Sequence, residues 1–421
     1  LTTTGMAPCA VLTDTKDVIV NPTPSVDAGA GQTICQGGTT TALSGTIGGA
    51  ATGGTWSTPD GGTFTPDANT LNATWTPPAG FSGTATLTLT TTGMAPCPSV
   101  TDVVNIIVSP TPVVDAGIGE TICQGGTTSV LSGSIGGSAT GGTWSTPAGG
   151  TFTPDANTLN ATWTPPAGFS GTATLTLTTT GMAPCAALND PIDIIVSPTP
   201  TVNAGPDETI CQGGTTAALG GTVGGAATGG TWTSTDGGTF TPDANTLNAT
   251  WTPPAGFSGT ATLTLSTTGM APCPAVDDTR QITVLPTPTV DAGADLTICQ
   301  DETTVGLSGS IGGSASGATW TSSAGGTFTP DANTLNATWT PVAGYSGTAT
   351  LTLTTTGMAP CAAISDTKNV IVNPVHIGTP VNVRICPGDT SSFGGQDFNS
   401  AGSYPVLFQN IYNCDSTVTL N

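Results

Sequence analysis

The sequence predicts an all-β protein of tandem antiparallel β-sandwiches joined by stiff Pro-rich linkers, and three observations lead to this prediction. An 88-residue unit occurs four times, so that residues 63–77 return letter for letter from positions 151, 239 and 327. Short segments rich in Thr, Val and Ile are separated by Gly and Pro. No segment has helical periodicity. A fixed repeat is typical of equivalent units in series, and an enzyme active site, needed once, is not expected in such a series.

The domain boundaries follow the repeat, because each copy opens on Pro-Thr-Pro, a sequence that favours an extended conformation. Residues 1–21 resemble the end of a further copy, since LTTTGMAPC is found again at 89–97. Residues 374–421 depart from the pattern and are expected to form a divergent, truncated β module. We expect the chain to be an excerpt from a longer polypeptide. The four complete repeats are 22–109, 110–197, 198–285 and 286–373.

In the first repeat, the alternation of apolar and polar residues and the Gly and Pro residues between segments predict seven strands. In residues 83–92, Ala85, Leu87 and Leu89 alternate with Thr, which is the pattern of a sheet with one buried face. The branched Cβ of Thr also favours strand. The expected strands are residues 26–35, 41–47, 54–58, 62–65, 72–76, 83–92 and 102–108.

Tryptophan indicates the core and the kind of sandwich. Trp56 lies on the third expected strand, where immunoglobulin-like sandwiches commonly bury an indole between their sheets. Phe64, Leu71 and Phe81 would complete the core with Trp75. The alternative is a carbohydrate-binding platform of exposed Trp rings. The predicted core residues are Trp56, Trp75, Trp144, Trp163, Trp232, Trp251, Trp320 and Trp339.

The charge of the chain excludes two classes of partner. Only 7% of the residues are charged and the net charge is −22. Nucleic acid binding needs clustered Lys and Arg, and an anionic membrane would also be repelled. The sequence has no run of eighteen apolar residues, so no membrane insertion of this segment is expected.

The eleven cysteines predict disulfides and an oxidising, extracellular location. They recur at two positions of the repeat, one early and one late, and two pairings are open: within a repeat, as Cys35 with Cys97, or across a junction, as Cys9 with Cys35. In the C-terminal module, RICPGDT at 384–390 echoes TICQGGT at 33–39 and Cys414 follows closely, which favours pairing within each repeat. The expected disulfides are Cys35–Cys97, Cys123–Cys185, Cys211–Cys273, Cys299–Cys361 and Cys386–Cys414.

Side chains for catalysis or metal binding are scarce. His376 is the only histidine, so neither a Ser-His-Asp triad nor a multi-histidine site is possible. Asp67 and Asp102 recur in every repeat and are the candidates for a calcium site, but no DxDxDG-type loop is present. Asp67 in the sequence PDAN is also typical of an Asx turn. We expect no enzyme activity, no catalytic residue and no cofactor, with calcium as the alternative.

All five methionines occupy one loop, GMAPC. Each Met either covers the neighbouring disulfide or presents an adaptable apolar contact to another chain. A weak contact repeated along a chain produces multivalent association, so a homo-oligomer or filament bundle is expected. The candidate inter-chain contacts are Met94, Met182, Met270 and Met358.

The motifs PTPxVDAGxxxTICQGG, ICxGD and CDSTVTLN resemble modules of giant surface proteins from gliding Bacteroidota, which are immunoglobulin-like or similar to the PKD domain. The resemblance covers the entire chain. It implies export by the type IX secretion route and a role in adhesins, sheaths or filaments. The near-identical copies are also similar to the grappling-hook appendages of predatory filamentous members.

Together these observations predict a structural segment of an extracellular filament or cell-surface appendage. It would be a stiff repetitive rod that self-associates and supports adhesion to prey or another surface. The alternative function is an array of modules that bind glycan or ice through exposed Trp or flat Thr faces. A target cell surface or glycan is therefore a second expected partner.

Overall fold

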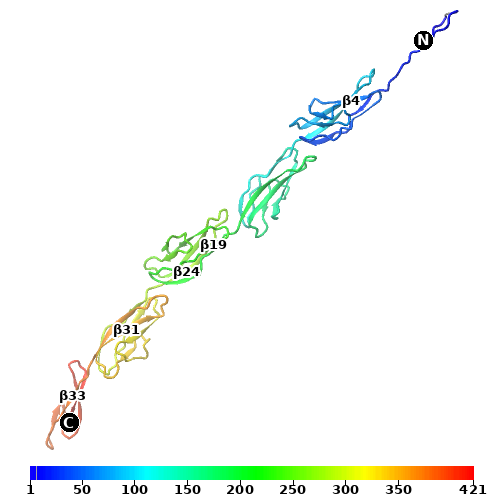
Figure 1. Ribbon diagram of the computed structural model, residues 1–421. Helices are drawn as coiled ribbons and strands as arrows, with labels where there is room; N and C mark the ends of the chain where they lie inside the picture. The colour runs from blue at the N-terminus through cyan, green and yellow to red at the C-terminus, as the bar shows by residue number, and fades with distance from the viewer. Residues whose placement is uncertain (6) are drawn as a thin grey trace. The chain divides into compact units, whose positions relative to one another are not determined.

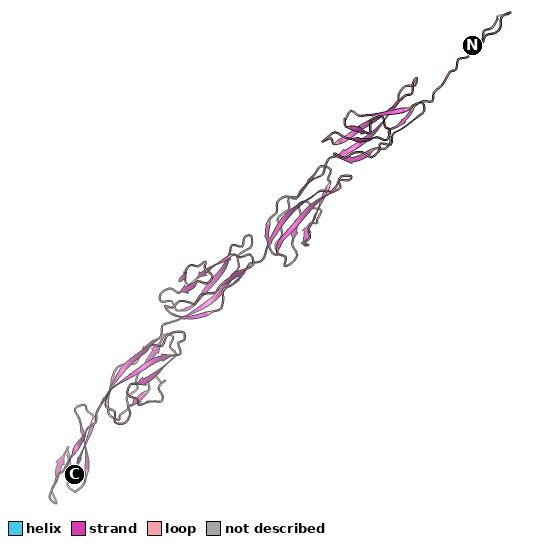
Figure 2. Cartoon of the chain, in the orientation of Figure 1, coloured by secondary structure: helices cyan, strands magenta, loops and turns pink. Residues whose placement is uncertain are grey.

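The computed structural model describes residues 1–5 and 7–421, so Met6 lies outside the described residues. All regular elements among the described residues are β-strands, and Figure 2 shows strands joined by loops. This confirms the predicted all-β class. No helix in the described part of the chain could cross a membrane. The chain divides into two compact units, Leu1–Thr199 and Pro200–Asn421, a division two residues beyond the start of the third predicted repeat.

The strands recur in the same order in every repeat (Figure 1). Repeat 1 contains β1 (Ser25–Asp27), β2 (Gln32–Cys35), β3 (Thr46–Gly48), β4 (Gly53–Ser57), β5 (Thr63–Thr65), β6 (Thr74–Thr76), β7 (Gly83–Thr92) and β8 (Thr101–Ser109). Repeat 2 contains β9 (Val113–Asp115), β10 (Thr121–Cys123), β11 (Ser134–Gly136), β12 (Gly141–Ser145), β13 (Thr151–Thr153), β14 (Thr162–Thr164), β15 (Gly171–Thr180) and β16 (Asn189–Ser197).

The second compact unit repeats this order. Repeat 3 contains β17 (Thr201–Asn203), β18 (Glu208–Cys211), β19 (Thr222–Gly224), β20 (Gly229–Ser234), β21 (Thr239–Thr241), β22 (Thr250–Thr252), β23 (Gly259–Thr268) and β24 (Asp277–Leu285). Repeat 4 contains β25 (Thr289–Asp291), β26 (Leu296–Cys299), β27 (Ser310–Gly312), β28 (Gly317–Ser322), β29 (Thr327–Thr329), β30 (Thr338–Thr340), β31 (Gly347–Thr356) and β32 (Ser365–Asn373).

Each repeat has eight strands rather than the expected seven, because segment 26–35 is split at a turn. The carboxylate of Asp27 accepts a hydrogen bond from the Gly29 amide at 2.8 Å, and Gly29 has a φ of 81°, a conformation that glycine adopts without strain. A Cβ at Gly29 would also lie 2.6 Å from the Leu43 carbonyl oxygen. The turn moves the chain from one sheet to the other, so β1 pairs with β3 while β2 pairs with β8.

The main sheet has the strand order β2-β8-β7-β4. The prediction of antiparallel pairing is correct for β4 with β7 and for β7 with β8, but β2 runs parallel to β8. The short pairs β1-β3 and β5-β6 form the other layer. The same orders recur in repeats 2 to 4, which makes each repeat an immunoglobulin-like sandwich.

The core lies between the two layers, and the Trp residues form its centre. The eight Trp side chains are at most 2% exposed, which confirms the core prediction. The indole N–H of Trp56 donates to the Leu71 carbonyl at 3.2 Å, and that of Trp75 donates to the Gly61 carbonyl at 3.0 Å. Leu87 and Leu89 on β7 are fully buried, as the alternation predicts. Buried rings with satisfied N–H groups offer no platform to a carbohydrate.

The C-terminal module is a reduced version of the repeat. It contains β33 (Ile377–Val381), β34 (Ser391–Phe393), β35 (Gln396–Phe398), β36 (Tyr404–Gln409) and β37 (Asp415–Leu420). β33 pairs in parallel with β37, and β37 pairs antiparallel with β36, as β2, β8 and β7 do in repeat 1. In residues 1–21, the described part contains one isolated bridge, between Thr2 and Thr13.

Candidate functional site at the repeat junction

The early cysteine of each repeat lies at the end where the chain leaves the repeat. In the parallel pair of β2 and β8, Cys35 lies opposite Ser109, the last residue of β8. The linker Pro110-Thr111-Pro112 follows immediately. The direction of β2 therefore places the Cys35 thiol at the junction with repeat 2.

The late cysteine lies at the opposite end of the same repeat. Cys97 is in the loop between β7 and β8, before β8 begins at Thr101. β8 has nine residues, and at about 3.3 Å per residue it separates the two ends by roughly 30 Å. A disulfide needs Cα atoms within about 7 Å of each other. Pairing of Cys35 with Cys97 is therefore sterically impossible.

The disulfides instead join the early cysteine of one repeat to the late cysteine of the next module. The Cα–Cα distances are 5.3 Å for Cys35–Cys185, 5.4 Å for Cys211–Cys361 and 5.5 Å for Cys299–Cys414. Cys123 and Cys273 are also disulfide-bonded. Cys9, Cys97 and Cys386 are free thiols in the described structure.

Both sequence-based pairings are therefore wrong. Cys9 does not bond to Cys35, and the same reason excludes every pair within a module: the two cysteines lie at opposite ends of the last strand. In the C-terminal module, Cys414 directly precedes β37, whereas Cys386 follows β33, which ends beside the far end of β37. The incorrect pairs are Cys35–Cys97, Cys123–Cys185, Cys211–Cys273, Cys299–Cys361 and Cys386–Cys414.

The Gln that follows each early cysteine holds the linker. The Gln36 amide donates to the Ser109 carbonyl at 2.8 Å, and its side-chain Nε2 donates to the Gly80 carbonyl at 2.7 Å. Its Oε1 accepts from the Thr111 amide at 3.3 Å. Since neither Pro110 nor Pro112 has an N–H, Gln36 accepts from the one backbone donor of the Pro-Thr-Pro linker.

This contact recurs at the other junctions that the described units contain. Gln124 accepts from the Thr199 amide at 3.2 Å, Gln212 from the Thr287 amide at 3.3 Å, and Gln300 from the Val375 amide at 3.1 Å. Sequence reasoning missed these glutamines, although the recurrent Cys-Gln dipeptide was a visible signal. One dipeptide thus provides a covalent tie to the next module and a hydrogen bond to the linker.

The GMAPC loop completes the junction from the other side. The Cys185 amide donates to the Met182 carbonyl at 2.7 Å, which closes a turn, and Cys185 Sγ lies 3.8 Å from the Pro110 carbonyl oxygen of the linker. Met94, Met182 and Met358 are less than one tenth exposed, and Met270 is half-buried. Met94, Met182 and Met358 are thus largely covered by their own chain, whereas Met270 is more exposed, and the inter-chain contact through the four methionines stays a prediction.

The two recurrent aspartates have structural roles in separate places. Asp67 accepts from the Asn69 amide at 2.8 Å, which confirms the Asx turn, and Asp102 accepts from the Ala28 amide at 2.7 Å. The loop of Asp67 is bonded to the outer edge of β4 through Trp56 and Ala68, whereas Asp102 is on β8, with β4 and β7 between them. Three strand spacings are about 14 Å, too far for both carboxylates to bind one calcium ion.

Asp366, the equivalent of Asp102 in repeat 4, has a lowered pKa. The Ala292 amide, with a second contribution from the Thr367 amide, holds the pKa of Asp366 below its usual value of 3.8. The Ala292 amide lies 2.8 Å from Asp366 Oδ2. Within the described residues, no three His, Cys, Asp or Glu side chains are grouped as a metal site.

Two buried cations stabilise loops in the second unit. Arg280 on β24 is 4% exposed and donates from Nη1 to the Leu219 carbonyl at 2.7 Å; its Nη2 lies 3.4 Å from the Glu208 carboxylate. Lys368 on β32 is 3% exposed and donates to the Leu307 carbonyl at 2.7 Å. Burial lowers the pKa of Lys368, while the carboxylates of Asp295 and Asp291 oppose the shift.

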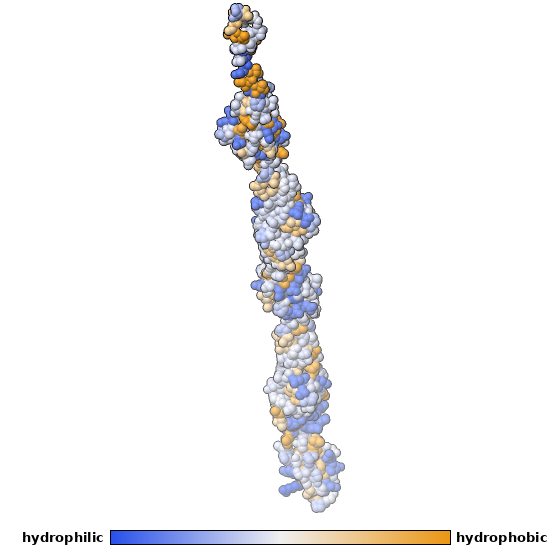
Figure 3. All heavy atoms as spheres, turned by 90° about the vertical axis from the view of Figure 1, so that its right-hand side faces the viewer, coloured by the Kyte–Doolittle hydropathy of each residue, from blue (hydrophilic) through white to orange (hydrophobic). Residues whose placement is uncertain are grey.

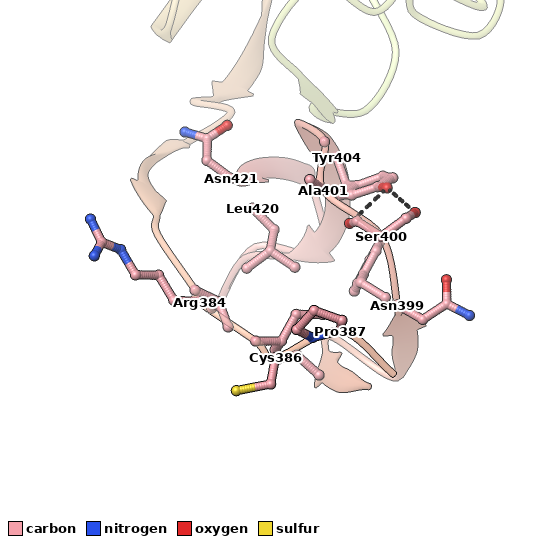
Figure 4. Close-up of a pocket in the computed structure, with 14 residues that line it drawn as sticks. Arg384, Cys386, Pro387, Asn399, Ser400, Ala401, Tyr404, Leu420 and Asn421 are labelled. Atoms are coloured by element: carbon pink, nitrogen blue, oxygen red, sulfur yellow. Dashed lines mark hydrogen bonds between the residues drawn. The ribbon is translucent and has the colours of Figure 1, made fainter. Parts of the chain in front are cut away.

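The C-terminal module has a cavity of about 500 Å³. Its lining contains no acidic or histidine side chain. Figure 4 shows that the Arg384 guanidinium and the Cys386 thiol point away from the cavity, while Leu420 points into it. The Tyr404 hydroxyl is engaged with the Ser400 hydroxyl at 2.9 Å. Most of the residues that line this cavity are exposed, so it is a hollow at the surface of the module.

The geometry defines a class of protein: tandem immunoglobulin-like sandwiches tied together at their junctions. No protein-family model matches the sequence, and no curated protein matches it. One matching solved structure is an I-band fragment from titin, with 13% sequence identity and a TM-score of 0.41. The match covers 62% of this chain and 98% of that chain. Drosophila N-cadherin EC1-4 matches at 12% identity and a TM-score of 0.29, over 82% of this chain and 100% of that chain.

Proposed function

We propose that this chain is a non-enzymatic structural segment of an extracellular bacterial filament or surface appendage. It acts as a stiff series of sandwiches that associates with further copies of itself and supports adhesion to prey or another surface. The observation that carries the proposal is the junction, where a disulfide such as Cys35–Cys185 and the hydrogen bond from Thr111 to Gln36 restrain the same linker. A chain whose modules must move freely would gain nothing from such ties.

The location follows from the cysteine chemistry. Disulfides persist in oxidising compartments. Cysteines that recur at fixed positions and form disulfides are typical of extracellular modules. Only four Lys or Arg residues are present, and of these Arg280 and Lys368 are buried. Trypsin-like proteases would therefore find few sites, which suits an extracellular thread.

The bacterial source and the secretion route rest on motif resemblance. The early TICQGG motif and the terminal CDSTVTLN motif are similar to those of surface proteins of gliding Bacteroidota. We extend the proposal to export by the type IX route on that ground. The test is to express the chain in a Bacteroidota host with and without a functional type IX system and to measure the amount outside the cell. We expect export only where the system is functional.

Self-association needs a surface that recurs with the repeat. The outward positions of the last strand provide one, because Ile107, Ile195 and Ile371 are 44–50% exposed at equivalent places. In repeat 3 the equivalent residue is Thr283. Figure 3 shows small, separate hydrophobic spots on the face in view rather than one large patch. Weak contacts that recur at a fixed interval add up through multivalency.

Electron microscopy and sedimentation velocity of the purified chain test the proposal. We expect thick rods with an axial repeat near one module. The matched variant replaces Ile107, Ile195 and Ile371 by Thr, the residue that repeat 3 already carries, and should shift the material toward single threads. Wild-type protein that stays as single beaded threads at all concentrations would contradict self-association.

A further inference from the structure

The disulfide between Cys35 and Cys185 closes a covalent loop over most of two repeats. The two cysteines are separated by 150 positions, so residues 36–184 lie inside the loop. This segment contains β3 to β8 of repeat 1 and β9 to β15 of repeat 2. The loop therefore encloses most of both hydrophobic cores, including all four Trp side chains of the two repeats.

The segments outside the loop are short and lie at its two ends. Residues 22–35 enter repeat 1 and contain β1 and β2, whereas residues 185–198 leave repeat 2 and contain β16. β2 runs toward the junction because it is parallel to β8. A pull applied at residues 22 and 198 therefore passes along β2, through the S–S bond and along β16.

A reduced chain has no such route. Within each repeat the pull is then carried only by hydrogen bonds, chiefly those between β2, which enters the repeat, and β8, which leaves it. Once these bonds break the repeat can unfold, and its 88 residues extend to roughly 30 nm. With the bond in place, residues 36–184 cannot be drawn out, because the two ends of the loop are fixed to each other. The restraint is covalent and does not depend on how strongly the strands pair.

The second unit has the same arrangement. Cys211 and Cys361 are also separated by 150 positions, and Cys299 and Cys414 by 115. These two loops overlap between residues 299 and 361. Repeat 4 is therefore enclosed in part by each of two disulfide loops, and breaking one of them leaves the other in place.

We propose that the cross-junction disulfides conduct tension past the folded repeats, so that the chain bears a pull without unfolding its modules. The inference deepens the proposed structural function and rests on it. It assigns to the early and late cysteines a mechanical role that a pairing inside each repeat would not provide. A bond within one repeat would reduce the length released when that repeat unfolds. It would leave the peptide linker as the only covalent connection across the junction.

Single-molecule force spectroscopy of the full chain, held at its two ends, tests the proposal. For oxidised protein we expect no unfolding step as large as a whole repeat. After reduction, steps of roughly 30 nm should appear, one for each repeat that unfolds. Thiol titration before the experiment verifies the oxidised state, in which Cys9, Cys97 and Cys386 are free.

The matched variant replaces Cys35, Cys211 and Cys299 by Ser and is pulled under oxidising conditions. It should show repeat-sized steps that the oxidised wild type lacks, while its Trp fluorescence before pulling stays that of folded repeats. Repeat-sized steps in verified oxidised wild-type protein would overturn the inference. This outcome is independent of the microscopy above, since a chain that conducts tension in this way can still fail to form rods.

Discussion

Repeats 1 and 4 differ in charge at one buried position of the last strand, and the comparison shows what a buried charge requires. Val104 on β8 and Lys368 on β32 occupy equivalent positions, and both are almost fully buried. Repeats 2 and 3 carry Ile192 and Arg280 at this position. The first unit therefore fills the site with an apolar side chain, and the second fills it with a cation.

The loop that precedes the second strand of each repeat changes in step with this position. Repeats 1 and 2 have Gly31 and Gly119, whereas repeats 3 and 4 have Asp207 and Asp295. Asp295 accepts from the Asn369 amide at 2.7 Å and raises the pKa of Lys368 against the effect of burial. In these four repeats a buried cation occurs only where this aspartate is present, and Arg280 has its own ion pair with Glu208. A nearby carboxylate makes a buried charge tolerable.

The largest effect is expected when the cation is placed in the wrong repeat. Val104→Lys puts an ammonium group into a site that keeps Asp27, the equivalent of Asp291, but has Gly31 in place of Asp295, so repeat 1 should lose about 2 to 3 kcal/mol of stability. Hydrogen exchange of repeat 1 peptides, with repeat 2 as the internal reference, measures the loss. Val104→Met keeps an unbranched stem without the charge and is the control. Equal protection in both variants would show that the carboxylate is irrelevant.

The reverse change should cost much less. Lys368→Met removes the donor to the Leu307 carbonyl and leaves Asp295, but Asp295 is exposed to water, and an apolar side chain gains from the buried site. We expect a change within about 1 kcal/mol in the stability of repeat 4. Exchange of repeat 4 peptides, compared with repeat 3, reports it. A loss as large as that from Val104→Lys would mean that the cation itself stabilises the fold.

The core and the junction differ in how much the sequence reveals. The positions of Trp56 and Trp75 and the alternation around Leu87 are local patterns, and local patterns predict burial and strand direction within a hairpin. The Trp core and the buried face of the long strand were predictable for this reason, whereas the buried cations Arg280 and Lys368 were not. The Asx turn at Asp67 was predictable as well, because it involves residues two positions apart.

The junction could not be predicted in the same way. Cysteines that recur every 88 residues leave open whether Cys35 pairs with Cys97 or with a cysteine one repeat further along. The answer depends on the parallel pairing of β2 with β8, which is a contact between segments 74 residues apart in sequence. Periodicity gives no information about the direction of β2 relative to β8. The turn beside Gly29 also splits the expected strand 26–35, so that β2 joins a different sheet from β1.

Alkaline pH should change the stability of repeat 4 relative to repeat 1, by less than the substitutions above. Burial lowers the pKa of Lys368 from its ordinary value of 10.5. The charge is therefore a cost to folding below the folded-state pKa, and this cost disappears as the pH rises toward 10.5. Repeat 4 should gain stability over that interval relative to repeat 1, where Val104 does not titrate. Hydrogen exchange corrected for its intrinsic pH dependence, with free thiols blocked, measures the difference. Lys368→Met should abolish it.

The smallest effect concerns a contact that both repeats share. Asp102 accepts from the Ala28 amide and Asp366 from the Ala292 amide, at 2.7 and 2.8 Å. Because the amide of Ala292 lowers the pKa of Asp366, this bond contributes stability above the usual carboxyl pKa of 3.8 and loses it as the pH falls through the folded-state value. Asp366→Asn should make exchange near Ala292 less dependent on acid while leaving Lys368 and its neighbours unchanged. If Asp366→Asn also altered the alkaline response of repeat 4, the cation site and the aspartate bond would be one coupled network rather than two independent features.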